Sequence, residues 1–411
     1  MAISQNFPDE GPSLNLNFAK AKSLDPRITF TRSSTGTYVD DNGLIVVAPT
    51  DSPRFDHDPT TGVCNGLLIE ESRTNAYQQS SNMSDAYWGA VNLTTTADAG
   101  AAPDGTTTAT LIVATTTTAT HALKPYMPLA STATITVSVF LKSNGDQYFT
   151  IRGDNQSNYC TFDLINGTVT SSSTLNSTTS SIVAYPNGWY RCIVTYTPST
   201  TANDPEFYIA NSSTYNISTF SGTGTNGFYI WGGQLETGEF PTSYIPTSGS
   251  TVTRSADRAS ITGTNFSSWF NPSEGTIVAH VSNRASLKYS SIYTFDAGTG
   301  SQAEQLVNTS GSTGQEQIFA RVSLSETGLI YNEAAIPNPK HAYAYKNADF
   351  GVAANGTSYV LTGTSRVPTG LNNLKIGRYT SEALYSLHGT LSQLVYYPSR
   401  LSNQQLAFLT K

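Results

Sequence analysis

The chain has 411 residues, of which 12% are charged and 38% hydrophobic, and its formal net charge is −7. Charged residues are about half as common as the roughly 25% of an average protein, and the absence of any lysine or arginine cluster argues against binding to nucleic acid or to an anionic membrane. This balance predicts a folded chain, and at about 150 residues per domain the length predicts two or three domains.

The first 65 residues are rich in turn signals. The run DDNG at 40–43 predicts a hairpin turn, and proline and aspartate crowd residues 53–59. The first thirteen residues have neither a basic start nor an apolar stretch, so they do not predict a secretory signal. We expect residues 1–65 to form an irregular N-terminal segment.

Beyond residue 65 the pattern changes to short runs of β-branched and aromatic residues, broken by Gly, Asn, Asp and Ser. Such runs predict strands. The clearest runs are 134–141, 148–152, 158–164, 189–197 and 228–235. Many short strands at this spacing are typical of sandwiches and jelly rolls, so we predict a jelly roll over residues 66–247.

The remainder of the chain predicts a second β unit. Residues 246–253 are rich in Ser, Thr and Gly and predict a linker. Strand signals resume near Gly275, and Ser402 is a good N-cap for a helix through 403–409. Residues 248–411 are therefore expected to form a second sandwich. We predict an all-β protein with two β-sandwich (jelly-roll) domains and a short C-terminal helix.

Several stretches follow one another in an order that occurs in a known class of proteins. They are RITFTRSSTGTYVDDNGLI, PRFDHDPTTG and GLLIEESRTNAYQQSSNMSDAYW between residues 27 and 88, APDGTTTAT at 102–110, NGWYRC at 187–192, and GFYIWGGQLETGEFPTSYIPT at 227–247. This series resembles bacteriophage head-spike and tail-fibre proteins with a carbohydrate-binding-module-like jelly roll. The resemblance covers most of residues 28–258. It implies a virion structural protein such as a spike, fibre or decoration, with residues 1–65 as its virion-attachment segment.

A second resemblance covers the end of the chain. The string LNNLKIGRYTSEALYSLHGTLSQLVYYPSRLSNQQLAFLT at 371–410 is similar to the closing strands and helix of laminin-G-like (concanavalin-A-like) sandwiches. The phage resemblance implies host-surface polysaccharide and other virion proteins as partners, a location in the virion, and, by analogy with spike families, a homotrimer. Insertion into a membrane is not expected, because the longest apolar run, at 44–48, is far too short.

Strand alternation identifies candidate ligand-binding residues, because side chains at i and i+2 share a sheet face. Phe149, Ile151 and Cys160 are expected to face inward. The outward residues are Tyr148, Arg152, Tyr159, Trp189 and Arg191. If their strands are neighbours, these five form one exposed aromatic and cationic face that suits a glycan, since sugars stack on aromatic rings and bond to arginine. The alternative is that the face packs on another domain or subunit, which would make the protein purely architectural.

Carboxylates near the ends of the jelly roll raise the question of a metal. Carbohydrate-binding jelly rolls often hold calcium between their first and last strands, and calcium takes 6–8 oxygen ligands. Glu70 or Glu71 near the first strand and Glu236 after the last would suit it, and we name Glu71 and Glu236 as candidate ligands of a structural Ca²⁺. The alternative is that both are ordinary strand-end carboxylates. No cofactor is required.

Enzyme signatures are missing from the sequence. The five histidines form no H-E-x-x-H pattern and there is no G-x-S-x-G elbow. We interpret His57 between Asp56 and Asp58 as part of a rigid turn, and we expect a protein that is not an enzyme. A polysaccharide-degrading tail enzyme is the alternative. The three cysteines, Cys64, Cys160 and Cys192, are too few for a zinc site or a disulfide scaffold, while one bridge between the last two stays open.

Overall fold

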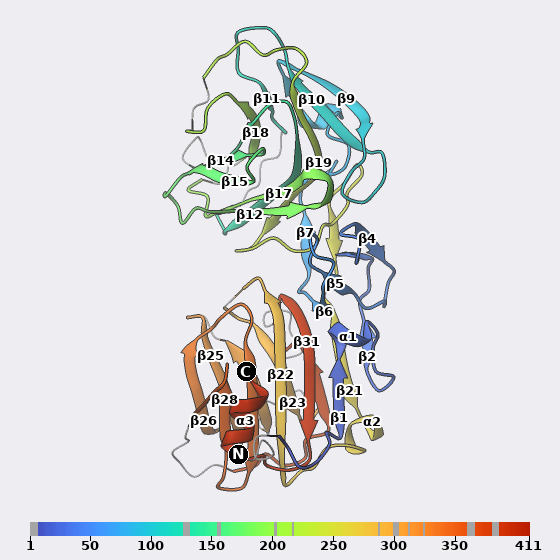
Figure 1. Ribbon diagram of the computed structural model, residues 1–411, viewed down its shortest axis with the longest axis vertical. Coiled ribbons are helices and arrows are strands. Elements are labelled where there is room, and N and C mark those ends of the chain that lie inside the picture. Colours follow the sequence, from blue (N-terminus) through green and yellow to red (C-terminus); the bar gives the residue numbers. More distant parts are fainter. Residues whose placement is uncertain are drawn as a thin grey trace.

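The computed structural model describes residues 7–125, 132–153, 158–200, 204–215, 218–286, 288–298, 304–310, 313–323, 325–359, 366–379 and 386–411. Two β-sandwiches stack end to end along the long axis, with N-terminal residues at the waist between them (Figure 1). The prediction of an all-β protein with two sandwiches and a short C-terminal helix is confirmed.

The first sandwich is the upper lobe in Figure 1. Its elements are η2 (Ala86–Trp88), β8 (Ala90–Val91), β9 (Leu93–Gly100), β10 (Ala109–Ala114), β11 (Ala122–Leu123), β12 (Ile135–Asn144), β13 (Tyr148–Gly153), β14 (Asn158–Asp163), β15 (Thr168–Ser172), β16 (Thr179–Tyr185), η4 (Pro186–Gly188), β17 (Trp189–Tyr196), β18 (Glu206–Ala210) and β19 (Gly227–Thr237). One sheet, which we call the β12 sheet, runs β16-β17-β12-β19-β10-β9. The other, the β13 sheet, runs β15-β14-β13-β18-β11-β8.

The core of this sandwich lies between its two sheets. Phe149, Ile151 and Cys160 point into it, as strand alternation predicts, and so does Cys192 from β17. Cys160 and Cys192 are free thiols, so the bridge that the sequence left open is not formed. Burial raises the pKa of Cys160 to about 12, so its thiol stays protonated and acts as a small apolar core residue.

The second sandwich is the lower lobe. Its strands are β1 (Leu14–Asn17), β2 (Thr29–Thr31), β5 (Phe55–His57), β6 (Cys64–Ile69), β21 (Arg258–Thr262), β22 (Glu274–Arg284), β23 (Ser291–Asp296), β24 (Gln305–Ser310), β25 (Gln315–Val322), β26 (Ser325–Ala334), β27 (Lys340–Lys346), β28 (Gly351–Ala354), β29 (Thr357–Tyr359), β30 (Asn373–Ile376) and β31 (Gly389–Tyr397). An eight-stranded sheet runs β29-β28-β27-β22-β31-β6-β5, with β1 also paired to β31. A seven-stranded sheet runs β2-β21-β30-β23-β24-β25-β26.

N-terminal residues complete both of these sheets. In β1, Leu14 lies opposite Tyr396 of β31, and Thr29 of β2 lies opposite Ser260 of β21. The boundary expected between residues 65 and 66 therefore falls inside β6, and the turn-rich segment is partly built into the second sandwich. The hairpin turn predicted at 40–43 is confirmed, because it joins the paired strands β3 (Gly36–Val39) and β4 (Ile45–Ala48).

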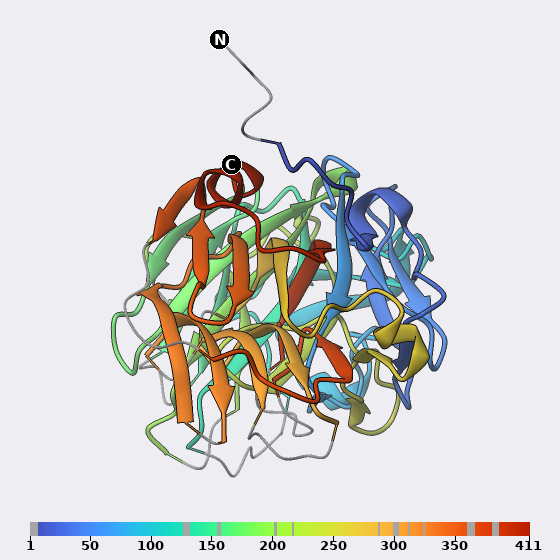
Figure 2. The same ribbon diagram turned by 90° about the horizontal axis from the view of Figure 1, so that it is seen from below.

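In the described parts of the chain, three short α-helices accompany the strands: α1 (Phe18–Ala21), α2 (Thr264–Ser267) and α3 (Asn403–Leu409). Ser402 caps α3 in a capping box with Gln405, as the sequence predicts. The helix buries Leu406 on the outer side of the eight-stranded sheet, and the ring centroid of Phe7 lies 4.5 Å from that of Phe408. In Figure 2, α3 is the dark red helix at the outside of the molecule. No helix in the described ranges is long and apolar enough to cross a membrane.

The chain crosses the waist twice. The two crossings pair as a short ribbon of β7 (Arg73–Asn75) and β20 (Val252–Arg254), and β7 is visible between the lobes in Figure 1. The second crossing overlaps the stretch 246–253 that the sequence predicts to be a linker. The linker is thus ordered by backbone hydrogen bonds to the first crossing.

Five charged side chains are buried beside this ribbon, and we call them the waist network. They are Arg32, Arg54, Glu70, Arg254 and Asp257. Arg54 bonds to both acids, with Nη2 2.5 Å from Asp257 Oδ2 and Nη1 2.8 Å from Glu70 Oε2. Arg32 Nη1 lies 3.1 Å from the other Asp257 oxygen. Although burial raises the pKa of Glu70, Arg254 and Arg54 together hold it well below its usual range, so Glu70 is charged.

Replacing Asp257 tests this network. We expect Asp257→Asn to lower the free energy of unfolding by about 3–5 kcal/mol, because two buried arginines then lose their shared anion. Asp349→Asn is the matched control: Asp349 is 57% exposed and pairs with Arg400 at the surface, so its loss costs about 0–1 kcal/mol. Urea unfolding of both variants measures the difference, and equal unfolding midpoints would contradict the role of the waist network.

Candidate functional site

The outer face of the β12 sheet, turned away from the β13 sheet, carries a second group of aromatic residues. Alternation along β19 sends Phe228 and Ile230 into the sandwich core and Tyr229 and Trp231 to this outer face. The buried members of the outer cluster are Ile45, Ala102, Ala109, Phe140, Trp189, Trp231 and Tyr244. Most of the face is therefore covered by other parts of the chain.

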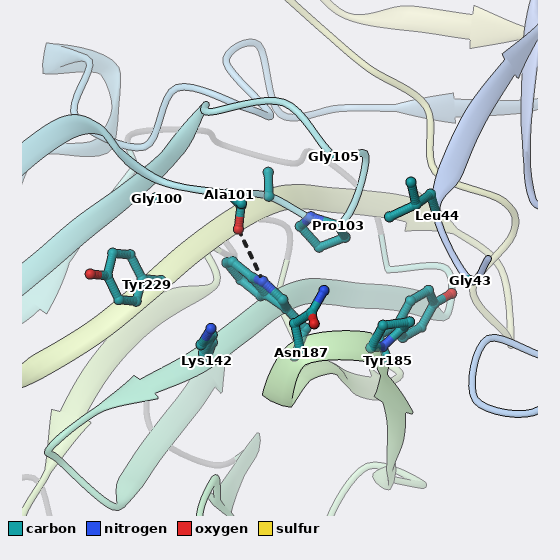
Figure 3. Close-up of a pocket in the computed structure, with 13 residues that line it drawn as sticks. Gly43, Leu44, Gly100, Ala101, Pro103, Gly105, Lys142, Tyr185, Asn187 and Tyr229 are labelled. Carbon is teal, nitrogen blue, oxygen red and sulfur yellow. Dashed lines mark hydrogen bonds between the residues drawn. The ribbon is translucent and has the colours of Figure 1, made fainter.

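A part of this face near Trp189 and Tyr229 stays open, and we call it the hollow. It has a volume of about 380 Å³ and is lined by thirteen residues (Figure 3). Its side chains come from β12, from η4 with its two neighbours, and from β19, while residues 43–44, 100–103 and 105 form the remaining rim. The side chains used below are Lys142, Tyr185, Asn187, Trp189 and Tyr229.

The aromatic rings of the hollow have different degrees of exposure. Trp189 is only 2% exposed, and its Nε1 donates to the carbonyl oxygen of Ala101 at 3.2 Å, so it forms the floor. Tyr229 and Tyr185 are half-buried and lie at the two ends of the hollow, with Lys142 and Asn187 between them (Figure 3). Rings at both ends and polar groups between them match a ligand with apolar faces and hydroxyl edges.

The electrostatics of the hollow are simple. Lys142 is the one charged side chain among the described residues that line it, and none of them is acidic. Burial raises the pKa of Tyr185 to about 12, so its phenol keeps its proton and can donate a hydrogen bond. The hollow therefore offers a cation and neutral donors and acceptors, but no carboxylate for acid–base chemistry.

The rim of the hollow depends on a glycine in the β3–β4 turn. Gly43 has φ +78°, and a Cβ there would lie 2.3 Å from the carbonyl oxygen of Pro59 and 2.5 Å from Cγ of Pro186. Any other residue would have to displace Pro186, which also lines the hollow. The turn recognised in the sequence therefore has a structural role at this site.

The five residues predicted to share one exposed face do not share it. Trp189 and Arg191 lie on β17 in the β12 sheet, whereas Tyr148, Arg152 and Tyr159 lie on β13 and β14 in the other sheet. Trp189 and Arg191 are also only 2% and 9% exposed. The prediction of one face is wrong because alternation fixes the side of a strand but not the sheet to which it belongs.

The three residues on the β13 sheet do lie together. Arg152 and Tyr159 are cross-strand neighbours, and Arg152 forms an ion pair with Glu206. The guanidinium of Arg152 also lies 4.8 Å from the ring centre of Tyr208, and Tyr159 stacks on Tyr215 with ring centres 3.7 Å apart. Partners within the chain thus engage this arginine and this tyrosine, and ligand binding by Tyr148, Arg152 and Tyr159 stays a prediction.

The two candidate calcium ligands also have partners in the protein. Glu71 Oε1 lies 2.5 Å from Nε of Arg73. Glu236 is buried and accepts hydrogen bonds from Gln234 Nε2 and from the backbone and hydroxyl of Thr242, at 2.6–2.9 Å. No group of three or more His, Cys, Asp or Glu side chains in the described parts of the chain is arranged to hold a metal. The carboxylate of Glu71 is thus engaged by an arginine and that of Glu236 by an amide and a threonine, and the structural Ca²⁺ at Glu71 and Glu236 stays a prediction.

Sequence reasoning missed four of the five side chains used above. Alternation along β19 places Tyr229 on the outer face once Phe228 is assigned to the core. The sequence alone does not make that assignment, because both faces of the strand carry apolar or aromatic residues. Lys142, Tyr185 and Asn187 carry no signal of their own, because they meet only when β12, β16 and β19 come together in one sheet.

Comparisons with known proteins do not assign this chain to a family. No protein-family model matches the chain, and no curated protein matches it. Among solved structures, the CBM40 of the Ruminococcus gnavus IT-sialidase is 16% identical, with a TM-score of 0.28, over 34% of this chain and 84% of that one. Domain 4 of AbnA, a GH43 extracellular arabinanase from Geobacillus stearothermophilus in complex with arabinotriose, is 15% identical, with a TM-score of 0.30, over 38% and 73%.

Domains LG4–5 of the mouse laminin α1 chain are 12% identical, with a TM-score of 0.25, over 70% of this chain and 89% of that one. Likenesses at these TM-scores carry no weight for the fold or function of this chain. The phage and laminin-G resemblances noted in the sequence therefore stay predictions, and the candidate site rests on its own geometry.

Proposed function

We propose that the protein binds a saccharide of the host surface in the hollow on its first sandwich and does not convert it chemically. The observation that carries the proposal is the arrangement of Tyr185 and Tyr229 at the two ends of the hollow, with Lys142 and Asn187 between them. A pyranose ring presents C–H faces to aromatic rings and hydroxyls to polar side chains, so it suits both parts of this lining.

The lining also narrows the class of saccharide. Lys142 is a strongly hydrated point charge that attracts carboxylate, sulfate or phosphate groups, and no acidic side chain of the lining repels them. Neutral and acidic sugars are therefore favoured over amino sugars with a free ammonium group. Hydrolysis is not favoured, because a glycoside hydrolase needs two carboxylates across the bond that it cleaves.

We further propose that the protein acts as part of a phage particle, as a trimeric spike, fibre or decoration that contacts other virion proteins. The support is the ordered resemblance over residues 28–258. Mass spectrometry of purified particles tests this location, and light scattering of the purified protein tests the trimer. Absence of the chain from particles, or a monomer in solution, would contradict the corresponding part of the proposal.

Substitution of Tyr229 tests the hollow. We expect Tyr229→Ala to weaken binding of capsule or lipopolysaccharide fragments by about fivefold to tenfold, since loss of an aromatic stacking partner is worth about 1–1.4 kcal/mol. Tyr159→Ala, a half-buried tyrosine on the opposite sheet of the same sandwich, is the matched control. An array of immobilised glycans identifies the ligand, and calorimetry then gives both affinities.

The outcomes separate the alternatives. Weakening by Tyr229→Ala alone supports the hollow, whereas weakening by Tyr159→Ala alone would move the site to the β13 sheet and contradict it. No binding to any glycan by the wild-type protein would favour the architectural alternative. Loss of viscosity of host capsule during incubation with the protein would favour the enzyme.

A further inference from the structure

A second cavity lies at the waist, where three parts of the chain meet, and we call it the waist cavity. Its volume is about 460 Å³. The N-terminal residues contribute Asp56 and His57 to its wall, the first sandwich contributes Tyr185 and Arg191, and the second sandwich contributes Asn283. Its size falls within the roughly 300–1,000 Å³ of ordinary ligand sites.

Asp56 is the chemically unusual group in this wall. Its Oδ1 accepts the backbone N–H of Val39 at 2.8 Å, and no hydrogen bond from any described residue reaches its Oδ2. Burial raises the pKa of Asp56 to about 7, with a contribution from Glu70, against the opposing effects of Val39 N–H, Arg54 and Arg191. Near neutral pH this carboxyl therefore exchanges between an acceptor form and a form that also donates.

Two buried polar atoms in the same wall also lack partners among the described residues. His57 is only 6% exposed, its Nδ1 donates to the carbonyl oxygen of Val39 at 2.9 Å, and its Nε2 has no partner. Arg191 donates through Nη2 to Ser138 and Thr242, but its Nε has no partner. Buried polar atoms are nearly always hydrogen-bonded in native proteins, so the wall of the cavity contains two polar side chains, His57 and Arg191, whose hydrogen-bonding capacity the protein does not use in full.

The remaining walls are aromatic and the charges nearly cancel. Phe140, Tyr185, Phe240 and Tyr244 line the cavity, which gives flat apolar surfaces of the kind that a sugar ring contacts. The charge of Glu70, which also lines it, is compensated within the waist network. Asp58 also lines the cavity, and although burial opposes them, hydrogen bonds from Thr60 and Thr61 lower its pKa, so it is charged. When Asp56 is protonated, the charges of Asp58 and Arg191 cancel, which favours a ligand without net charge.

We propose that the waist cavity is a second binding site, for a neutral, hydroxyl-rich sugar ring, with Asp56 as its principal hydrogen-bonding group. A hydroxyl both donates and accepts, so a sugar offers a partner to the carboxyl of Asp56 in either of its protonation states. The site is separate from the hollow, although Tyr185 lines both, and it does not depend on the hollow binding a saccharide.

The protonation of Asp56 gives a pH-dependent check of this geometry. Arg54, Glu70 and Arg191 act on its pKa, and it contributes to the raised pKa values of Cys64 and Tyr185. The other titratable side chains that line the cavity are Tyr38, His57, Asp58, Tyr244 and His388. The pKa of Asp56 in the folded protein lies above its ordinary 3.8, so its contribution to stability is complete below about pH 4 and is lost as the pH rises to about 7. Asp56→Asn does not titrate, and its unfolding midpoint relative to wild type should rise between pH 5 and pH 8. A difference between the two unfolding midpoints that does not change with pH would contradict the raised pKa of Asp56.

Ligand-observed NMR with the methyl glycosides of glucose, galactose and mannose tests the site. Val183 is exposed on β16 and lines the cavity, so Val183→Trp should block it without removing any polar group. Val63→Trp is the matched control, because Val63 is similarly exposed but does not line the cavity. We expect Val183→Trp and Asp56→Asn each to weaken glycoside binding at least fivefold, and Val63→Trp to bind as wild type does. Thermal unfolding confirms that each variant is folded.

Each outcome decides the proposal. Binding that both Val183→Trp and Asp56→Asn leave unchanged would overturn it, and so would the absence of binding by any of the three glycosides, which would mean that the cavity holds water only. Glycoside binding that Tyr229→Ala abolishes and Val183→Trp does not would support the hollow and overturn the waist site. Loss of glycoside binding with Val183→Trp and Asp56→Asn, but not with Tyr229→Ala, would support the waist site. This conclusion would hold whether or not the hollow binds a saccharide.

Discussion

The waist network is the constraint on which the rest of the structure depends. Arg32 and Arg54 come from the N-terminal residues, Glu70 follows β6, and Arg254 and Asp257 lie between the two sandwiches in the sequence. Buried ion pairs add little net stability, because desolvation offsets their attraction, but separating them leaves unpaired buried charges at high cost. Any arrangement in which the N-terminal residues leave the waist is therefore penalised, and the cavity between the lobes keeps one shape.

The same N-terminal residues decide which surfaces of the first sandwich stay accessible. Ile45 of β4 packs on the outer cluster of the β12 sheet, together with Phe140 and Trp189. A face that would otherwise present several aromatic rings to solvent thus becomes a small second core. The hollow stays open beside it, lined by Tyr229 and Lys142 together with residues 43–44, 100–103 and 105.

Local signals in the sequence predicted the elements better than their assembly. Alternation placed Phe149, Ile151 and Cys160 in the core, and the cap at Ser402 located the last helix. β19 contains a β-bulge, where Gly232 has φ +66°. The extra residue shifts the alternation of side chains by one position, so Glu236 lies on the same outer face as Tyr229. Pairings such as β1 with β31 join opposite ends of the chain, and no short-range pattern records them. The candidate site depends on these longer-range pairings, so its residues were mostly missed.

Residues from outside the block 66–247 help to build both of the proposed sites. Gly43 and Leu44 form part of the rim of the hollow, and Asp56 and His57 form part of the waist cavity. These four residues precede the block. Asp56 and His57 lie on β5, which is paired into the second sandwich through β6 and β31, whereas Gly43 and Leu44 lie at the turn of the separate β3–β4 hairpin. A fragment that begins at residue 66 would keep Tyr185 and Tyr229 but lose one side of each site. It would also leave Glu70 without Arg54, so the isolated block would be both altered in binding and destabilised.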